Sequence, residues 1–260
     1  MKKLSAVIIT WNEEDNIGRC IESLWRVADE VIVLDSYSCD DTVRVAEEKG
    51  AIVKQEKFCG YIEQKNRALQ LAKHDYVLSL DADEVLSKKL IESILQEKME
   101  FKHSAYFMNR FNNYCGRFIK HGLWYPDRKI RLFNKKYAIW GGMNPHDKIE
   151  LQDKKSGKFL EGDILHYGFN SVDDHIQRNE NFSSIAAWSI FEAGKKKHWS
   201  KIILSPAWSF FNGYFLRLGF LDGYYGFIIA CLTAKLSYQK YQKLRRLQMQ
   251  SEKNISWTNN

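Results

Sequence analysis

The stretch Tyr76-Val-Leu-Ser-Leu-Asp-Ala-Asp-Glu84 is the most informative part of this 260-residue sequence. Its first five residues form a short apolar run, which predicts a strand that is covered on both faces. Directly after that run, Asp81 and Asp83 place two carboxylates one residue apart. Two close carboxylates raise each other's pKa unless a cation lies between or beside them. Because oxygen ligands suit Mg²⁺ or Mn²⁺, the two acids are candidate metal ligands, and an ordinary acidic turn after a strand is the alternative.

Three further strands precede this one, and helices are predicted between them. The strands are expected at Leu4–Thr10, Glu30–Asp35 and Ala51–Gln55, and the helices at 16–25, 40–49 and Tyr61–Ala72. Three βα units in a row predict a parallel, right-handed α/β sheet. In such sheets, ligands bind beyond the carboxyl ends of the strands.

Polar residues gather at those strand ends. Thr10-Trp11-Asn12-Glu13 follows the first strand, Asp35 ends the second and Asp81-Ala82-Asp83 ends the fourth. We expect them to form one binding edge, although Asp35 could instead be a helix cap or turn residue. Lys65, on the helix before the acidic strand, could offset phosphate charge or simply be solvated.

The rest of the first 194 residues continues the same domain. A helix capped by Ser87 should run to about residue 99, and a second helix should occupy about 173–193. Strands are expected at Ala105–Phe111, Lys129–Phe133 and Asp163–His166. We therefore predict one α/β domain over 1–194 and a separate helical extension over 195–260.

The composition favours a globular protein of a reducing compartment. Hydrophobic residues make up 45% and charged residues 27% of the sequence, which excludes a disordered chain. The five cysteines are odd in number and scattered, so neither a disulfide framework nor a zinc site is indicated. No secretion signal is recognised at the N-terminus, and we expect a cytoplasmic protein.

The C-terminal extension is aromatic and basic. Its apolar runs, Ile202–Leu216 and Gly223–Ala234, each fall short of the roughly 20 residues that a spanning helix needs. From Lys235 onward six basic residues stand against one acid, Glu252, within a formal net charge of +7. This pattern predicts one or two helices lying in a membrane interface, attracted to an anionic surface. The alternative is a helical hairpin packed on the catalytic core or on a second subunit.

Several motifs in matching order resemble family 2 inverting glycosyltransferases of the GT-A fold, which are Rossmann-like. They are Val7-Ile-Ile-Thr-Trp-Asn-Glu-Glu14, Val31-Ile-Val-Leu-Asp-Ser-Tyr-Ser-Cys-Asp-Asp-Thr42, Gln64-Lys-Asn-Arg-Ala-Leu69 and Leu78-Ser-Leu-Asp-Ala-Asp-Glu84. A narrower likeness is to the lipopolysaccharide-core β-1,4-glucosyltransferases. It rests on His121-Gly-Leu-Trp-Tyr-Pro-Asp127, Arg131-Leu-Phe133, Leu165-His-Tyr167 and Phe215-Leu-Arg-Leu-Gly-Phe-Leu-Asp-Gly223.

The resemblance implies a nucleotide-diphosphate sugar as donor. The Thr10–Glu13 turn and Asp35 would hold the nucleoside, and Asp83, with Asp81 in support, would hold the metal and diphosphate. The acceptor-side acid falls at Asp147, beside His146, where the family more often has a His-Glu pair. Asp147 would be the general base and His146 a neighbour or metal ligand. A loop pair that merely hydrogen-bonds itself is the alternative.

The resemblance also implies an acceptor substrate, and the C-terminal extension indicates where in the cell the enzyme acts. A hexose, glucose-like, would pass to a lipopolysaccharide-core or other lipid-linked glycan. The aromatic, basic extension would keep the enzyme peripheral at the inner face of the inner membrane, with no nucleic-acid partner.

Two other functional classes remain open at this stage. Asp81 and Asp83 also fit the Asp-x-Asp pattern of haloacid-dehalogenase-like phosphatases, in which the first Asp is a nucleophile. That motif normally follows the first strand, whereas here three βα units precede it. The other class is a non-catalytic nucleotide-sugar-binding or membrane scaffold protein.

Overall fold

The computed structural model describes the chain except residues 144–145, 153–156, 195–198 and 259–260, and describes the backbone alone at 143, 146 and 252–258. The chain folds as two compact units. One comprises residues 1–112 and 127–168, and the other comprises 113–126 and 169–260. The domain boundary predicted from the sequence, between residues 194 and 195, is not tested by this division and stays a prediction.

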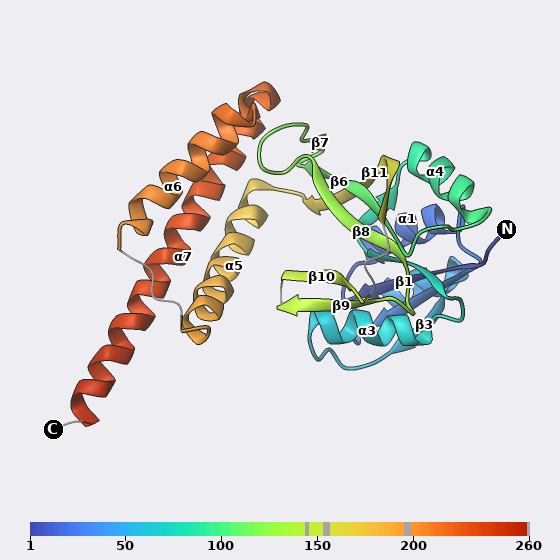
Figure 1. Ribbon diagram of the computed structural model, residues 1–260, viewed down its shortest axis with the longest axis horizontal. Helices are drawn as coiled ribbons and strands as arrows, with labels where there is room; N and C mark the ends of the chain where they lie inside the picture. The colour runs from blue at the N-terminus through green and yellow to red at the C-terminus, as the bar shows by residue number, and fades with distance from the viewer. Residues whose placement is uncertain (144–145, 153–156, 195–198, 259–260) are drawn as a thin grey trace. The chain divides into compact units, whose positions relative to one another are not determined.

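The first unit is built on a mixed sheet (Figure 1). Strands β1 (Leu4–Thr10), β2 (Glu30–Asp35), β3 (Ile52–Gln55) and β4 (Tyr76–Asp81) pair in the order β3-β2-β1-β4, and these pairs are parallel. The order continues with β8 (Asp127–Asn134), β6 (Ala105–Tyr114), β11 (Gly157–Phe169) and β5 (Glu84–Leu86). Of these, β8 pairs antiparallel with β4 and β6, and β11 pairs antiparallel with β5.

Helices cover both faces of this sheet. On one face, α1 (Glu14–Leu24), α2 (Thr42–Glu48) and α4 (Lys88–Lys98) bury apolar side chains in a shared core, to which Ile17, Leu24 and Leu90 belong. On the other face, α3 (Tyr61–Leu71) packs with the hairpin of β9 (Ala138–Met143) and β10 (His146–Leu151), through Ala68, Trp140 and Ile149. The parallel strands are therefore covered on both sides, as their apolar sequence predicts.

The predicted helix starts are confirmed in part. The Ser87 hydroxyl caps α4 by accepting a hydrogen bond from the Leu90 N–H, as expected. At the start of α2, where Asp40 and Asp41 are the predicted capping residues, the Asp41 side chain makes no capping hydrogen bond. Its neighbour Asp40 accepts from the Thr42 N–H at 3.0 Å instead. The short strand β5 and the β9–β10 hairpin were not predicted.

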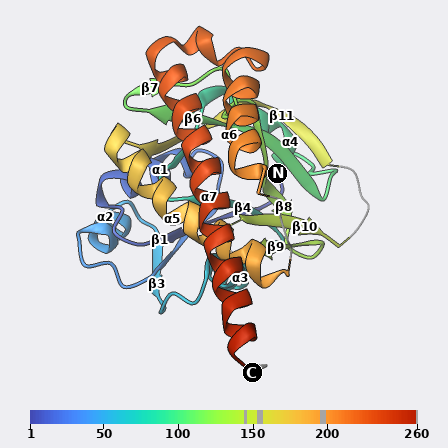
Figure 2. The ribbon, with the colours of Figure 1, turned by 90° about the vertical axis from the view of Figure 1, so that its left-hand side faces the viewer.

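The second unit is largely helical (Figure 2). It contains β7 (Arg117–Phe118), α5 (Val172–Glu192), α6 (Lys201–Phe211), a π-turn η1 (Asn212–Leu216), a 3₁₀-turn η2 (Gly219–Asp222) and the long α7 (Gly223–Thr258). α7 packs against both α5 and α6. Among the described residues no single helix has the length and apolarity to cross a membrane, while α6 and α7 together pass that test as a pair bent by 71°.

Candidate active site

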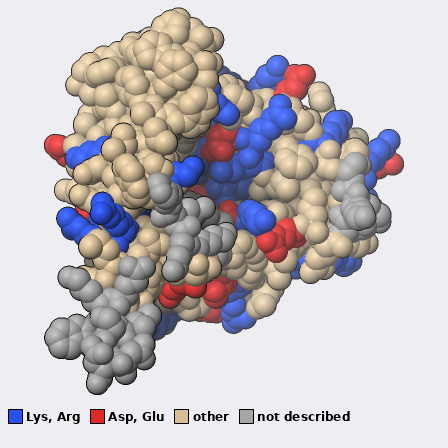
Figure 3. All heavy atoms as spheres, turned by 60° about the vertical axis from the view of Figure 1, so that its left-hand side comes forward, with Lys and Arg blue, Asp and Glu red and all other residues tan. Residues whose placement is uncertain are grey.

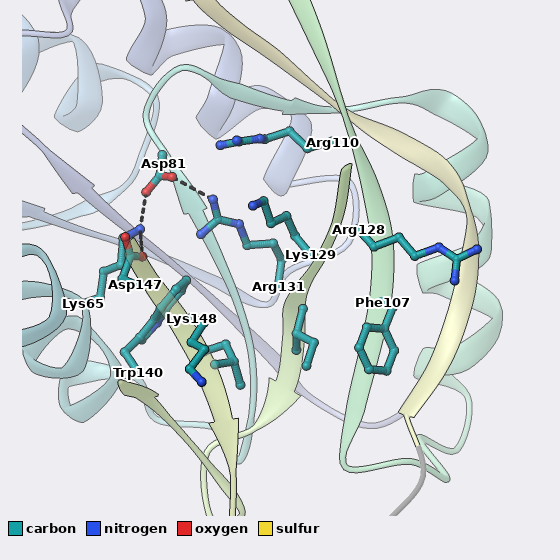
Figure 4. A pocket seen from close by; sticks show the side chains of 12 residues that line it. Lys65, Asp81, Phe107, Arg110, Arg128, Lys129, Arg131, Trp140, Asp147 and Lys148 are labelled. Carbon is teal, nitrogen blue, oxygen red and sulfur yellow. Dashed lines mark hydrogen bonds and ion pairs between the residues drawn. The ribbon is translucent and has the colours of Figure 1, made fainter. Parts of the chain in front are cut away.

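Asp81, the last residue of β4, lies in a network of buried charges (Figure 4). Its Oδ1 is 2.9 Å from Lys65 Nζ on α3, and its Oδ2 accepts a hydrogen bond from Arg131 Nη2 on β8 at 2.7 Å. Both cations are only 4% exposed. Burial alone would raise the pKa of Asp81, but the charges of Arg131 and Lys65 outweigh it and hold the pKa well below its usual range. Asp81 is therefore a carboxylate with a cation on each oxygen.

Lys65 joins Asp81 to the predicted base. Its ammonium donates to Asp147 Oδ2 at 2.8 Å and lies 4.4 Å from the centre of the Trp140 ring. Asp147 is on β10, far from Asp81 in the sequence, so the hairpin of β9 and β10 is what brings the two acids together. One ammonium shared by two carboxylates fixes all three side chains.

Asp83 has a different partner from Asp81. Its Oδ2 is 3.2 Å from His166 Nε2, and His166 Nδ1 is 2.7 Å from Asn112 Oδ1. Strand β11 places His166 opposite Glu84 of β5, which brings the imidazole to the acidic turn. Burial tends to raise the pKa of Asp83, and the neighbouring His166 reverses this and lowers it. Ala82, between the two acids, is buried.

A divalent cation would find two donors at this turn. Because His166 Nδ1 faces an amide oxygen, it can keep the ring proton, so Nε2 could give its lone pair to a cation bound beside Asp83 in place of the proton it now shares with that carboxylate. One carboxylate oxygen and one imidazole nitrogen suit Mn²⁺, with further ligands coming from a diphosphate and water. Within the side chains that are described, no group of three or more His, Cys, Asp or Glu is arranged to hold a metal.

Glu84 anchors the turn from behind. Its side chain is fully buried, and its Oε2 accepts a hydrogen bond from the Asp81 N–H at 3.0 Å. Its Oε1 accepts from Arg131 at 2.9 Å and lies 3.8 Å from Arg110 Nη1. A buried carboxylate is stable only with such partners, so Glu84 and Arg131 together fix the end of β4.

Asp35 organises the neighbouring loop instead of pointing an open carboxylate outward. It is fully buried, and its Oδ2 accepts hydrogen bonds from the Ser38 N–H and from Gln55 Nε2, both at 2.9 Å. The Ser38 hydroxyl donates to its other oxygen. The turn alternative considered for Asp35 therefore describes its contacts in this structure.

The turn after β1 is tied to that loop. Asn12 adopts a left-handed backbone conformation at φ 53°, its N–H donates to Ser38 Oγ at 2.8 Å, and its Oδ1 accepts from the Cys39 N–H at 2.9 Å. The Glu13 N–H donates to Thr42 Oγ1 at 2.7 Å. The buried Thr10 Oγ1 has no hydrogen-bond partner within the described part of the chain. The turn and the loop thus form one ordered platform.

Two aromatic rings stand out from this platform. Trp11 is 62% exposed and Tyr37 is 60% exposed, although both are large side chains. Tyr37 also has a left-handed backbone, at φ 61°. Rings held in the open by a rigid loop are suited to stacking on a planar ligand.

A cavity of about 470 Å³ opens beside Asp81 and Asp147. Its wall is cationic: Figure 4 shows Arg110, Lys129 and Arg131 extending toward Asp81, while Arg128 extends away. Arg110 and Lys129 share one carboxylate, Asp127, at 3.0 and 3.1 Å. An acid pair facing several cations suits a ligand that carries both hydroxyl and phosphate groups.

The structure therefore brings some of the predicted site residues together and not others. Lys65, Asp81 and Asp147 come together, while Asp83, two residues after Asp81, contacts His166 instead. Sequence reasoning gave no role to Arg131 and His166, although a charged or imidazole side chain inside an apolar strand could have signalled them. The predicted His146 side chain lies outside the described residues.

The family model and the sequence relatives agree on one family. The model of Glycosyl transferase family 2 matches residues 5–150. An uncharacterized glycosyltransferase of Rickettsia typhi is 34% identical, over 100% of this chain and 92% of that protein. The lipopolysaccharide core biosynthesis glycosyltransferase LpsC of Rhizobium meliloti is 28% identical, over 92% of this chain and 93% of its own length. A solved glucosyl-3-phosphoglycerate synthase of Mycobacterium tuberculosis is 26% identical, with a TM-score of 0.36 over 43% of this chain and 44% of that one.

Proposed function

The chain belongs to glycosyl transferase family 2, and from that premise we propose that it moves a glucose-like hexose from a nucleotide-diphosphate sugar to a lipid-linked glycan. Its fold is the α/β GT-A fold, and its donor is a nucleotide sugar. The likeness to LpsC supports a lipopolysaccharide-core acceptor. The observation that carries the proposal is the Lys65 bridge, which holds Asp147 beside Asp81 at the mouth of the cavity.

Asp147 is the proposed general base. Its carboxylate takes the proton of the acceptor hydroxyl while the acceptor oxygen bonds to the anomeric carbon. The bond from that carbon to the diphosphate oxygen breaks in the same step, and the electron pair leaves with the diphosphate. A single displacement inverts the configuration, so an α-linked donor gives a β-linkage. Lys65 keeps the Asp147 carboxylate in place, and its second contact to Asp81 keeps Lys65 in place.

Cations of the chain balance the charge of the leaving group. Lys65 and Arg131 already hold Asp81, and Arg110 extends toward the same point from β6 (Figure 4). Mn²⁺ or Mg²⁺ would be held by Asp83 and His166 and would neutralise the diphosphate, whereas Asp81 could support the metal only by releasing Lys65 or Arg131. Preorganised charge of this kind is usually the largest contribution to catalysis.

The nucleoside is proposed to bind on the platform formed by the Thr10–Glu13 turn and the loop after Asp35. Trp11 and Tyr37 offer exposed rings there, and Asp35 contributes by shaping the loop. The phosphatase alternative fits poorly, because both oxygens of its would-be nucleophile, Asp81, are bound to cations. The acid pair also follows the fourth parallel strand, not the first.

The substitution Asp147→Asn tests the base. It keeps the shape of the side chain but cannot accept the proton, so we expect turnover to fall by about 10² to 10⁴-fold with donor affinity nearly unchanged. The exposed Glu150→Gln on the same strand is the matched control. Weakened donor binding with intact turnover would overturn the role of Asp147.

A donor screen tests the function as a whole. Thermal shifts with a panel of nucleotide sugars, with and without Mn²⁺, should single out one donor. Slow release of nucleotide from that donor would then show a transferase active site. Affinity without any such release would instead indicate the non-catalytic binding protein.

The site of action is proposed to be the cytoplasmic face of the inner membrane. The five cysteines are free, which is compatible with a reducing compartment. A lipid-linked acceptor would be presented at that membrane surface. Fractionation of cells that express a tagged chain, before and after a salt wash, would show whether the protein is membrane-bound and peripheral.

A further inference from the structure

The second unit carries an apolar surface at the bend between α6 and α7. We call it the elbow surface and define it by Trp208, Phe211, Phe215, Leu218, Phe220 and Tyr224, which are between 44% and 67% exposed. α6 has no buried residue, although most of its side chains are apolar. Figure 3 shows the corresponding area, at the upper left, as a broad expanse with almost no charged side chains. A contiguous apolar patch of this kind marks an interaction site.

Close backbone packing and hydrogen bonds hold the chain at the elbow. Gly219 and Gly226 allow the chain to approach itself closely, because a Cβ at Gly226 would lie 1.9 Å from the Gly219 carbonyl oxygen. Asp222 is buried and accepts hydrogen bonds from the N–H groups of Lys120 and His121, at 3.1 and 2.8 Å. These contacts hold η2 on the β7 side of the unit and leave the rings outward.

The charges along α6, the elbow and α7 are almost all positive, with Arg217 in the elbow itself and most of the others on α7 beyond it. Between residues 199 and 251 the sequence has seven basic residues, beginning with Lys201 and Arg217 and ending with Arg245 and Arg246. The acid in that stretch is Asp222, which is buried and 3.3 Å from His121 Nδ1. Three more lysines, Lys195–Lys197, precede the stretch in sequence. A partner that covers the elbow surface and the adjoining lengths of α6 and α7 should therefore combine an apolar layer with negative charge.

We propose that the elbow surface binds an anionic lipid bilayer, with its aromatic rings in the interfacial layer and the basic residues at the headgroups. Trp and Tyr beside Phe and Leu, flanked by Lys and Arg, are what such an interface selects. A second copy fits less well, because a two-fold interface would bring the same positive surfaces together. The 71° bend of the α6–α7 pair suits shallow insertion of the elbow and not a straight span.

Vesicle flotation tests the inference. The full chain is mixed with vesicles of phosphatidylcholine alone, or of phosphatidylcholine with phosphatidylglycerol. Wild type should float with the anionic vesicles, and the pair Trp208→Ser, Phe211→Ser should bind them at least about ten-fold more weakly. The matched control is Trp188→Ser on α5, which removes a ring that is 51% exposed but outside the elbow surface, and its binding should match wild type.

Each remaining outcome has one meaning. Binding that is equal for wild type and the double variant would overturn the inference, as would an absence of binding to both kinds of vesicle. A stable wild-type dimer that the double variant dissociates, seen by size-exclusion chromatography without lipid, would assign the surface to a second copy and also overturn it. Release of nucleotide from a soluble donor is measured in parallel, so failure of the proposed enzyme activity is seen separately.

Discussion

The two units of this protein depart from the usual rule of folding in opposite ways. The first unit buries charge: Lys65, Arg131 and Glu84 are almost inaccessible to solvent. The second unit exposes apolar rings, with Trp208 at 59% and Tyr224 at 67%. Buried charge is tolerable only when each group has a partner, and an exposed apolar surface calls for a partner from outside the chain. We therefore relate the buried charges of the first unit to substrate binding and the exposed rings of the second unit to the proposed contact with a bilayer.

The link between the acidic site of the first unit and substrate binding can be tested at Asp83, where we expect the largest effect on activity. Asp83→Ala removes the carboxylate that would hold the cation and diphosphate, so Mn²⁺-stimulated release of nucleotide should fall about 10³-fold, or about 4 kcal/mol. The measurement is kcat/KM for the donor chosen in the screen. Asp75→Ala, an exposed acid just before β4, is the control. Full metal-stimulated activity in Asp83→Ala would remove Asp83 from the site.

The second test breaks the charge network of the first unit. Lys65→Met leaves Asp81 and Asp147 without their shared cation, so the free energy of unfolding should fall by about 3 kcal/mol. Urea unfolding at neutral pH measures it. Lys136→Met, which removes an exposed pair with Asp75, should leave the urea midpoint where it is. Equal urea midpoints for the two variants would mean that the buried Lys65 network contributes no more to stability than an exposed ion pair.

The third test concerns the core of the second unit and should give the smallest effect. His175 is 3% exposed, packs against Phe169 and Trp124, and its Nδ1 is 3.1 Å from the Tyr114 hydroxyl. Burial lowers its pKa from 6.5 to about 4. Between those values the unfolded chain binds a proton that the folded chain does not, so stability should fall as pH falls from 6.5 to 4.

From pH 6.5 to 5 this loss is about 2 kcal/mol, and urea unfolding at several pH values measures it. Unfolded aspartates titrate near 3.8, so the upper part of the window, from pH 6.5 to 5, reports mainly on the histidine. His175→Gln should flatten the dependence there. A variant with the same slope as wild type would show that His175 is not the titrating group.

Local sequence patterns predicted the elements that carry strong periodicity. The four parallel strands and the helices α3, α4 and α5 lie within a few residues of their expected bounds. The three-residue β5 escaped prediction because its run is short and its partner β11 is distant. The β9–β10 hairpin escaped it because two glycines in β9 and three charged residues in β10 weaken the strand pattern. The sequence also left two roles open for Asp35, ligand contact or turn residue. They differ only in the direction of the side chain, which the structure shows and the sequence does not.

The sequence by itself determined the family, through motifs in matching order, and the parallel half of the sheet, through three successive βα units. It also determined the edge of the sheet at which Asp81 and Asp83 lie, because ligands bind beyond the carboxyl ends of parallel strands. Only the tertiary structure decided which charge meets which. Lys65 joins Asp81 to Asp147, which is 82 positions from Lys65 in the sequence, and His166 reaches Asp83 through a strand pairing that no local pattern encodes. The energies of such contacts depend on burial and distance in space, neither of which sequence spacing contains.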